Sequence, residues 1–319
     1  MTKERKLPLC IDLDGTLIRS DVTQESVLLF LRKYPWKILN IFIWLCKGRA
    51  FLKARLAAYV MIEPSLLPYN ECFLEYIKDK AEKGHDLYLV TAADQKCAEI
   101  IHNYLGIFKE YLASDETNNL RAFAKAQALC LRFGSEKFIY AGNSRHDLPV
   151  WAKSAEIISV NTPQKILKNA ENFHKKIHKF QDEPLKSKSI LKDLGTYPWF
   201  RYYFFLYLLS MVGGYVFNKI KINHFDFYQY ISFFIAISFS SIAAFLLGGL
   251  FNLEEIRRNP LTKETFLSTS RLTIVKVMYF IVIFTIIGFI LEGFLSFFVF
   301  IFQFIMIAIK IKSKNRKIN

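Results

Sequence analysis

Long apolar stretches fill the last 120 positions of this 319-residue chain, and they limit its fold more than any other feature. Each of the three longest carries at most one charge: Trp199–Phe217, Phe227–Phe251 and Val277–Ile309. An α-helix rises about 1.5 Å per residue and a bilayer core is about 30 Å thick, so the 33 residues of the last stretch are too many for one crossing. We predict a tight hairpin within it at Glu292–Gly293, and hence an all-α membrane domain of about four transmembrane helices over residues 197–319.

Basic residues between these stretches indicate how the chain is oriented. Lys and Arg are frequent in the loop Asn252–Ile274 and in the tail Lys310–Lys317, whereas the predicted hairpin turn has none. Basic loops stay on the cytoplasmic side, so we expect a multi-pass protein of the inner, cytoplasmic membrane with both termini in the cytoplasm. We expect the net charge of +15 to attract the protein to anionic lipid. We expect no nucleic acid as a partner, because the chain shows no motif of basic and aromatic residues that reads one.

The first half of the chain alternates short apolar runs with helical patterns. Four runs have the length of buried strands: Leu7–Leu13, Leu87–Thr91, Phe138–Ala141 and Ile157–Val160. Helical stretches such as Glu71–Lys83 and Lys96–Leu105 lie between them. Buried strands separated by helices predict an α/β domain with a doubly wound parallel sheet, which we assign to residues 1–165. Its five Cys residues form no C-x-x-C pair, so we expect reduced thiols.

Two segments depart from the alternation of strands and helices. Residues 21–69 form an insert with helical patterns only, and its stretch Trp36–Cys46 is strongly apolar but too short to span a bilayer. That stretch is either a buried helix of a small bundle or a helix that rests in the membrane interface. Its basic neighbours suit the second alternative: Lys33, Lys37, Lys47 and Arg49. Residues 166–196 have the composition of a basic linker, where His174 and His178 are four apart but lack an acidic or Cys partner for a metal.

The strongest chemical signal follows the first predicted strand, in the segment Asp12–Leu17 (DLDGTL). A carboxylate at Asp12 can attack phosphorus and form an aspartyl phosphate. Asp14, two residues on, lies on the same face of an extended chain, and it can protonate the leaving oxygen and later activate water. Gly15 lets the backbone turn away sharply at the end of the strand.

This hexapeptide resembles the first motif of the haloacid dehalogenase superfamily, and three further motifs of that family follow in order. Thr91 ends the second strand, where the resemblance implies a hydroxyl that binds phosphate. Lys125 matches the family's Lys that neutralises phosphate and nucleophile, and Ala141–Asp147 matches its acidic magnesium loop. The resemblance covers about residues 5–165 and implies that the insert 21–69 is a helical, type-one cap.

The resemblance also implies a Mg²⁺ cofactor, with one departure from the family's pattern. The fourth motif often has two acids, and here the first of them is Asn143. The implied ligands are the carboxylates of Asp12 and Asp147, the main-chain carbonyl of Asp14, and Asn143 directly or through water. Oxygen ligands beside a phosphate suit Mg²⁺. The ion would orient the phosphate and screen the charge between two anions.

Single positions in these motifs also have simpler, structural interpretations. Thr91 can be a residue that merely favours a strand, Lys125 a solvated helix residue and Asn143 a turn residue. Asp94 can be an ordinary N-cap of the helix that follows it. Two residues next to the predicted metal ligand Asp147 can be exposed without touching a substrate: Arg145 and His146.

The membrane half is similar, though less strongly, to the N-terminal part of UbiA-type prenyltransferases. Its second apolar stretch runs into Gly248–Pro260, where that family has an N-D-x-x-D-x-x-x-D segment followed by basic residues. Other residues replace the aligned Asn and Asp positions here: Gly248, Gly249, Asn252 and Ile256. Glu254 and Glu255 are off register, so we expect no prenyl transfer by this half. Its basic residues can set topology or meet a lipid head group: Arg257, Arg258 and Lys263.

Together these patterns predict a membrane-anchored, Mg²⁺-dependent phosphomonoesterase that works through an aspartyl phosphate on the cytoplasmic side. Asp12 and Asp14 would be its catalytic residues. The expected partners are membrane lipid and a phosphorylated small molecule or lipid-linked phosphate, for which a polyprenyl phosphosugar is one candidate. Two alternatives remain open: a prenyl or phosphoribosyl transferase with an accessory first domain, and a non-catalytic subunit that completes the helix bundle of a membrane partner.

Overall fold

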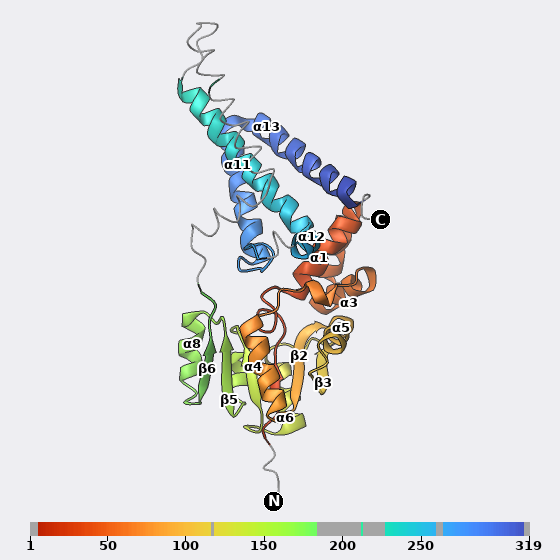
Figure 1. The fold of residues 1–319 in the computed structure, drawn as a ribbon, viewed down its shortest axis with the longest axis vertical. Helices are drawn as coiled ribbons and strands as arrows, with labels where there is room; N and C mark the ends of the chain where they lie inside the picture. The colour runs from red at the N-terminus through yellow and green to blue at the C-terminus, as the bar shows by residue number, and fades with distance from the viewer. Residues whose placement is uncertain (1–5, 116–117, 184–211, 213–226, 260–263, 316–319) are drawn as a thin grey trace, which may run out of the picture. The chain divides into compact units, whose positions relative to one another are not determined.

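The computed structural model describes residues 6–115, 118–183, 212, 227–259 and 264–315 of the chain (Figure 1). The chain divides into two compact units, Met1–Pro184 and Leu185–Asn319. All strands found among the described residues belong to the first unit, and the described part of the second unit is helical.

A six-stranded sheet forms the centre of the first unit, with the strand order β3-β2-β1-β4-β5-β6. The strands are β1 Leu9–Ile11, β2 Leu87–Asp94, β3 Glu110–Ser114, β4 Ile139–Gly142, β5 Glu156–Val160 and β6 Ile177–Phe180. All neighbouring strands are parallel, and Ile11 aligns with Leu89 of β2 and with Ala141 of β4. The predicted α/β class with a doubly wound parallel sheet is confirmed, and its four central strands coincide with the four predicted apolar runs.

The two strands that the sequence analysis missed lie at the edges of the sheet. β3 has one buried residue and β6 has none. An edge strand has one side open to water, so it lacks the continuous apolar run of a central strand. β6 and the preceding helix α8 (Gln164–Glu171) occupy part of the segment expected to be a basic linker. The first unit thus extends past residue 165, and His178 faces Glu156 of β5, with Nε2 3.3 Å from Oε2.

Helices cover both faces of the sheet, as the alternation of side chains along each strand requires. Besides α8 they are α4 Glu71–Glu82, α5 Gln95–Leu105, α6 Phe123–Phe133 and α7 Leu148–Trp151. Leu9 and Ile11 of β1 pack on one face with buried residues of α4 and α5. Cys10 packs on the other face with buried residues of α6, α7 and α8. The central strands are therefore buried on both sides, which explains their continuous apolar runs.

The helical insert between β1 and α4 is present as predicted. It comprises α1 Val22–Lys33, α2 Ile38–Cys46 and α3 Arg49–Tyr59, with the 3₁₀ turns η1 Pro35–Lys37 and η2 Pro64–Leu66. Its core is aromatic: the ring centroid of Phe30 lies 5.2 Å from that of Trp44 and 5.5 Å from that of Tyr59. We refer to this insert as the cap.

The helix α2 does not have the burial expected for the inner helix of a bundle. All nine of its residues are described, and Trp44 is the only buried one. Leu39 is 68% exposed and Phe42 is 59% exposed within the described residues. This exposure does not fit a buried helix, and the interfacial interpretation stays a prediction.

The described part of the second unit contains the helices α11 Phe227–Phe251, α12 Leu253–Arg258 and α13 Ile274–Asn315, with turns between α12 and α13. Gly293 interrupts α13 with a φ of 55° and a ψ of −134°, and the ribbon of α13 changes direction (Figure 1). The interruption falls where the hairpin was predicted.

The described residues do not support the expected membrane domain of about four helices. Among them, Ile274–Leu291 is the one stretch long and apolar enough to cross a membrane, because the apolar part described in α11, Ile235–Phe251, is shorter. The first predicted span, Trp199–Phe217, lies outside the described residues apart from Val212. The number of four spans therefore stays a prediction.

Candidate active site

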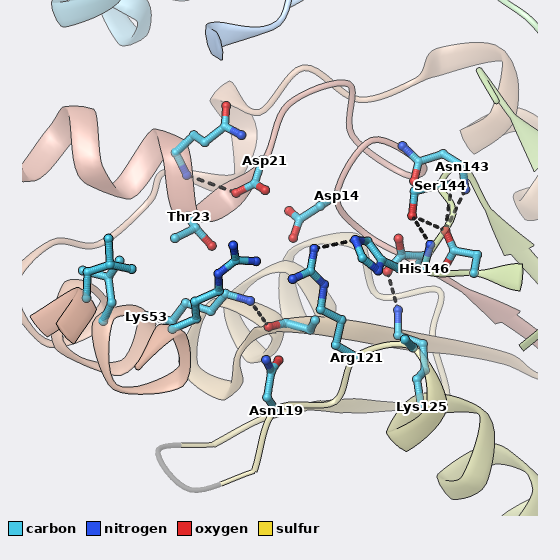
Figure 2. Close-up of a pocket in the computed structure, with 18 residues that line it drawn as sticks. Asp14, Asp21, Thr23, Lys53, Asn119, Arg121, Lys125, Asn143, Ser144 and His146 are labelled. Atoms are coloured by element: carbon cyan, nitrogen blue, oxygen red, sulfur yellow. Dashed lines mark hydrogen bonds and ion pairs between the residues drawn. The ribbon is translucent and has the colours of Figure 1, made fainter. Parts of the chain in front are cut away.

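Five of the six residues predicted for the site line one cavity of about 400 Å³ in the first unit (Figure 2). They are Asp12, Asp14, Lys125, Asn143 and Asp147. Asp12 directly follows β1, and its main-chain N–H donates to the carbonyl of Ala141 in β4 at 3.0 Å. The carboxyl ends of neighbouring parallel strands meet at one edge of the sheet, which brings together residues that are far apart in the sequence.

Asp12 and Lys125 form a buried ion pair in this cavity. Nζ of Lys125 donates to Oδ1 of Asp12 at 2.7 Å. The side chain of Lys125 is 5% exposed and that of Asp12 is 11% exposed. Burial raises the pKa of Asp12 to about 6; Lys125 opposes the rise and the charge of Asp147 adds to it. Lys125 thus offsets part of the effect of burial and favours the ionised form of Asp12, which is the form that can act as a nucleophile.

Asp14 lies at the junction between the sheet and the cap. Its Oδ1 accepts a hydrogen bond of 2.8 Å from the main-chain N–H of Val22, the first residue of α1. Burial, followed by the charge of Asp21, raises the pKa of Asp14 well above its ordinary value, although the bond from Val22 opposes this. Asp14 also lines the cavity. Its surroundings favour the protonated form, which a general acid needs.

A network of hydrogen bonds holds Asp147 in place. Its Oδ2 accepts from the main-chain N–H groups of Asn143 and Ser144 and from the Ser144 hydroxyl, at 2.9 to 3.1 Å. Its Oδ1 accepts from the hydroxyl of Tyr140 at 2.9 Å, and that hydroxyl accepts from Nζ of Lys125 at 3.0 Å. The fully buried Tyr140, which the sequence analysis did not single out, therefore links the ion pair to the predicted magnesium loop.

Two glycines allow the loops of the site to approach one another. A Cβ at Gly142 would lie 2.6 Å from Cγ of Asp147, and a Cβ at Gly15 would lie 2.0 Å from Nδ2 of Asn143. Gly15 also has a φ of 76°, a backbone conformation that side chains disfavour. A larger residue at either position would have to displace a predicted metal ligand.

The implied Mg²⁺ ligands lie around one cavity, but they do not form a cage of acids. Within the described part of the chain, Asp, Glu, His and Cys side chains form no group of three or more that could hold a metal ion. The implied set combines the carboxylates of Asp12 and Asp147 with the Asn143 amide and the main-chain carbonyl of Asp14, all hard oxygen donors that suit Mg²⁺. Oδ1 of Asp147 accepts a hydrogen bond from Tyr140 and keeps capacity for an ion or for water bound to one.

Two residues of β2 that the sequence analysis named lie outside the cavity lining. Thr91 is fully buried, and its Oγ1 accepts a hydrogen bond of 2.9 Å from the N–H of Ala93. The neighbouring Ala92 lines the cavity instead, so the phosphate contact of Thr91 stays a prediction. Asp94 is the N-cap of α5, since its Oδ1 accepts from the N–H of Lys96 at 2.9 Å, which confirms the structural interpretation of Asp94.

Three basic residues complete the cavity, and none of them was predicted for the site: Arg49, Lys53 and Arg121. Arg49 and Lys53 are four residues apart on α3, so they share a face of that helix, and this spacing is the signal that could have identified them. Figure 2 shows Arg121 beside His146, whose Nε2 lies 2.7 Å from a guanidinium nitrogen of Arg121. His146 also lines the cavity, and burial, together with the charge of Arg121, lowers its pKa, which favours a neutral ring.

In the second unit, residues of the predicted prenyltransferase-like segment make structural contacts. A Cβ at Gly249 would lie 2.9 Å from Cδ1 of Leu267, so the glycine permits close packing there. Nε of Arg257 donates to the main-chain carbonyl of Ser268 at 2.9 Å. Lys263 lies outside the described residues. The resemblance to UbiA-type enzymes stays a prediction.

Comparison with known proteins adds a partial relative. No family model matches the chain. Among curated proteins, the uncharacterized protein y4nM of Sinorhizobium fredii (strain NBRC 101917 / NGR234) is 41% identical over 157 residues. The match covers 49% of this chain and 30% of the relative, so the chain spans less than a third of that protein's length.

Several solved structures are similar to the chain at low scores. A protein of unknown function from Bordetella pertussis Tohama I has a TM-score of 0.42 and 14% identity, covering 54% of this chain and 97% of its own. A phosphoserine phosphatase in its apo form has a TM-score of 0.41 and 18% identity, with coverages of 59% and 98%. A predicted phosphoglycolate phosphatase from Haemophilus somnus 129PT has a TM-score of 0.35 and 17% identity, with coverages of 50% and 86%. These scores are too low to assign a function to the chain.

Proposed function

We propose that this chain is a phosphomonoesterase that acts through an aspartyl phosphate, as its resemblance to the haloacid dehalogenase superfamily implies. The proposal rests mainly on the buried pair of Asp12 and Lys125 at the end of β1, with Asp14 lining the same cavity. A carboxylate held beside a cation supplies a nucleophile together with a charge that neutralises phosphate, and the second carboxyl supplies an acid.

In the first step, a carboxylate oxygen of Asp12 attacks phosphorus, and the bond between phosphorus and the ester oxygen breaks. The departing oxygen takes the proton of Asp14, so an alcohol leaves and an aspartyl phosphate remains. Lys125, whose Nζ lies 2.7 Å from Oδ1 of Asp12, offsets the negative charge that collects on the phosphoryl oxygens.

In the second step, water attacks the phosphorus of the aspartyl phosphate and gives a proton to the ionised Asp14. The bond between phosphorus and the Asp12 oxygen breaks, inorganic phosphate is released, and both carboxyls return to their starting states. The same group must therefore lose and regain a proton in each cycle. The raised pKa of Asp14 supports this role, because it favours the protonated form that the first step requires and makes the ionised group a better base for the second.

We propose Mg²⁺ as the cofactor of this reaction. Asp12 and the main-chain carbonyl of Asp14 would hold it, and Asn143 and Asp147 would complete the set directly or through water. When bound, the ion would orient the phosphate and screen its charge from the nucleophile. The hard oxygen donors support this choice, as does the hydrogen bond by which Tyr140 orients Asp147.

The proposed substrate is a phosphomonoester carried by a lipid or a lipid-linked sugar. Leu45 and Leu52 of the cap line the cavity together with Arg49. A wall that is both apolar and basic suits a phosphate attached to an apolar group. The stretch Ile274–Leu291, which is long and apolar enough to cross a membrane, supports a substrate that resides in one.

In this proposal the second unit is a membrane anchor, with several spans and both termini in the cytoplasm. Gly249 and Ile256 stand where the resembled transferases have carboxylates, and neither side chain can bind a cation. A prenyl diphosphate would then lack the Mg²⁺ that offsets its charge and helps its departure. The basic loop and tail would share the cytoplasmic side with the active site.

Turnover by the purified full chain in detergent tests the proposal, with p-nitrophenyl phosphate and a lipid phosphate as substrates. We expect hydrolysis that needs Mg²⁺ and a kcat that falls by a factor of about 10³ or more in Asp12→Asn, because the covalent route is lost. The matched control is Asp86→Asn, which changes an exposed Asp of the same unit that pairs with Lys109. This control should keep the parent kcat.

A labelling experiment separates the covalent route from direct attack by water. With p-nitrophenyl phosphate radiolabelled at phosphorus, Asp14→Asn should accumulate label that hydroxylamine releases. The nitrophenolate departs without a proton, but the attacking water is no longer activated. Asp12→Asn should carry no label. Turnover near the parent rate in Asp12→Asn, or label that survives the loss of Asp12, would overturn the mechanism.

A further inference from the structure

The cap presents an apolar surface that the rest of the first unit does not cover. Its exposed side chains range from 47% to 75% exposure, and we call them the α2 face: Trp36, Ile38, Leu39, Phe42, Ile43 and Leu45. The opposite side of α2 packs through Trp44 on the aromatic core of the cap. No residue of α2 is charged, so the helix is apolar on both sides and needs a second apolar environment.

The length of α2 excludes a helix that spans the bilayer. Its nine residues make a helix about 14 Å long, which is too short for a bilayer core of about 30 Å. A helix of this kind can instead lie in the plane of the interface, with its apolar side at the boundary of the acyl chains.

The charges in the chain segment that carries the α2 face all have the same sign, although two of them, Arg49 and Lys53, line the cavity. Residues 26–62 contain seven basic residues and no Asp or Glu: Arg32, Lys33, Lys37, Lys47, Arg49, Lys53 and Arg55. Nζ of Lys37 lies 4.8 Å from the ring centroid of Tyr34 and 5.0 Å from that of Tyr59, so its charge is held beside the start of α2. Such a rim attracts an anionic surface, whereas pairing with a second copy would bring two basic rims together.

We propose that the α2 face docks on a bilayer that contains anionic lipid. Its apolar side chains would enter the region of the acyl chains, and Lys33, Lys37 and Lys47 beside it would meet the head groups. The candidate span Ile274–Leu291 of the same chain supports a bilayer as the occupant. Leu45 belongs to the α2 face and also lines the candidate active site, so the docked face adjoins the cavity. Arg49, the first residue of α3, lines the cavity too. The docking does not depend on the proposed phosphatase activity.

A fluorophore that senses its surroundings can test the docking in the full chain reconstituted in nanodiscs. The exposed native thiols Cys46 and Cys72 are first replaced by Ser, and the fluorophore is attached at Leu39→Cys. Leu131→Cys is the matched control, because Leu131 is also an exposed leucine of the first unit, at 81% against 68% for Leu39. The discs contain either equal parts of phosphatidylglycerol and phosphatidylcholine or phosphatidylcholine alone.

Two quenchers then report where each fluorophore lies. We expect nitroxide groups on the acyl chains to quench the fluorophore at residue 39 several-fold more than the one at residue 131, and aqueous iodide to do the reverse. The lipid quenching at residue 39 should weaken in pure phosphatidylcholine and in high salt, because the attraction is partly electrostatic.

Three results would overturn the proposal. Iodide quenching at residue 39 as strong as at residue 131 would place the face in water. Shielding from both quenchers would mean that protein covers the face, either the second unit or a second copy of the chain. Lipid quenching that is equal in both kinds of disc would remove the role of anionic lipid.

Discussion

Replacing Tyr140 with Phe should weaken the first unit, because the hydroxyl of this residue joins two charged groups in the interior. The hydroxyl accepts from Nζ of Lys125 at 3.0 Å and donates to Oδ1 of Asp147 at 2.9 Å. Tyr140 is fully buried, and burial raises its pKa well above the ordinary value, so the neutral phenol makes both bonds. The ring is kept in Tyr140→Phe, and the substitution therefore tests the hydroxyl.

The size of the effect follows from the partners that remain. A hydrogen bond to a charged group contributes about 1.5–3 kcal/mol, so two of them would contribute roughly 3–6 kcal/mol to the free energy of unfolding. Lys125 still has Asp12 at 2.7 Å, and Asp147 still accepts from Ser144, so neither charge is left unpaired. We expect the lower end, about 3 kcal/mol. Since 1 kcal/mol shifts the Tm of a domain of this size by about 2–4 °C, the Tm should fall by roughly 6–12 °C.

Thermal unfolding of the full chain in detergent, followed by near-ultraviolet circular dichroism, measures this shift. Tyr88→Phe is the matched control, because Tyr88 and Tyr140 align with Cys10 from the two sides of β1, and Tyr88 is also buried. Tyr88→Phe removes a hydroxyl from the same face of the sheet and leaves the hydrogen bonds of Tyr140 with Lys125 and Asp147 in place. Equal Tm values for the two variants would refute the reasoning.

Three further predictions concern backbone space, thiol burial and topology. Gly15→Ala should lower turnover and Tm more than Gly84→Ala, because both glycines have a positive φ but nothing lies within 4 Å of a Cβ at Gly84; equal losses would contradict this. Cys72 is exposed and should react with a soluble thiol reagent in the native chain, whereas Cys97, whose pKa burial raises to about 12, should react only after unfolding, as mass spectrometry of the labelled peptides can measure. A Cys introduced at Ser313 should resist an impermeant reagent in intact cells if the termini are cytoplasmic, and its ready modification would refute that topology.

Burial on both faces made the central strands predictable from the sequence. Ile157–Val160 of β5 is buried throughout, and its apolar run is visible without any knowledge of its neighbours. Ile177–Phe180 of β6 has no buried residue and contains Lys and His, so its sequence resembles a solvated linker. It becomes a strand through its pairing with β5, a contact between segments that are distant in the sequence. Local patterns do not encode such a tertiary effect.

The residues of the candidate site also differ in whether a local pattern or a tertiary contact determines their role. Asp12 could be predicted as a carboxylate at a strand end, and Lys125 from the family motif that its segment resembles. Tyr140 has the pattern of an ordinary strand residue, and its role exists only where Lys125 and Asp147, 15 and 7 residues away, meet at its hydroxyl. Lys53 reaches the site only because α3 folds over the strand ends, where its Nζ donates to the carbonyl of Ala92.

These contacts give the positive charges of the cavity two different roles. Lys125 is bound to Asp12 and Tyr140 within the core, so its position depends on the sheet. Arg49 and Lys53 belong to α3 of the cap, and their positions depend on a helical insert whose aromatic core is separate from the two cores of the sheet. Changes in the cap can therefore alter which groups surround a phosphate while the residues proposed to react with it stay in place. The cap would then select the substrate, and the residues at the strand ends would carry out phosphoryl transfer.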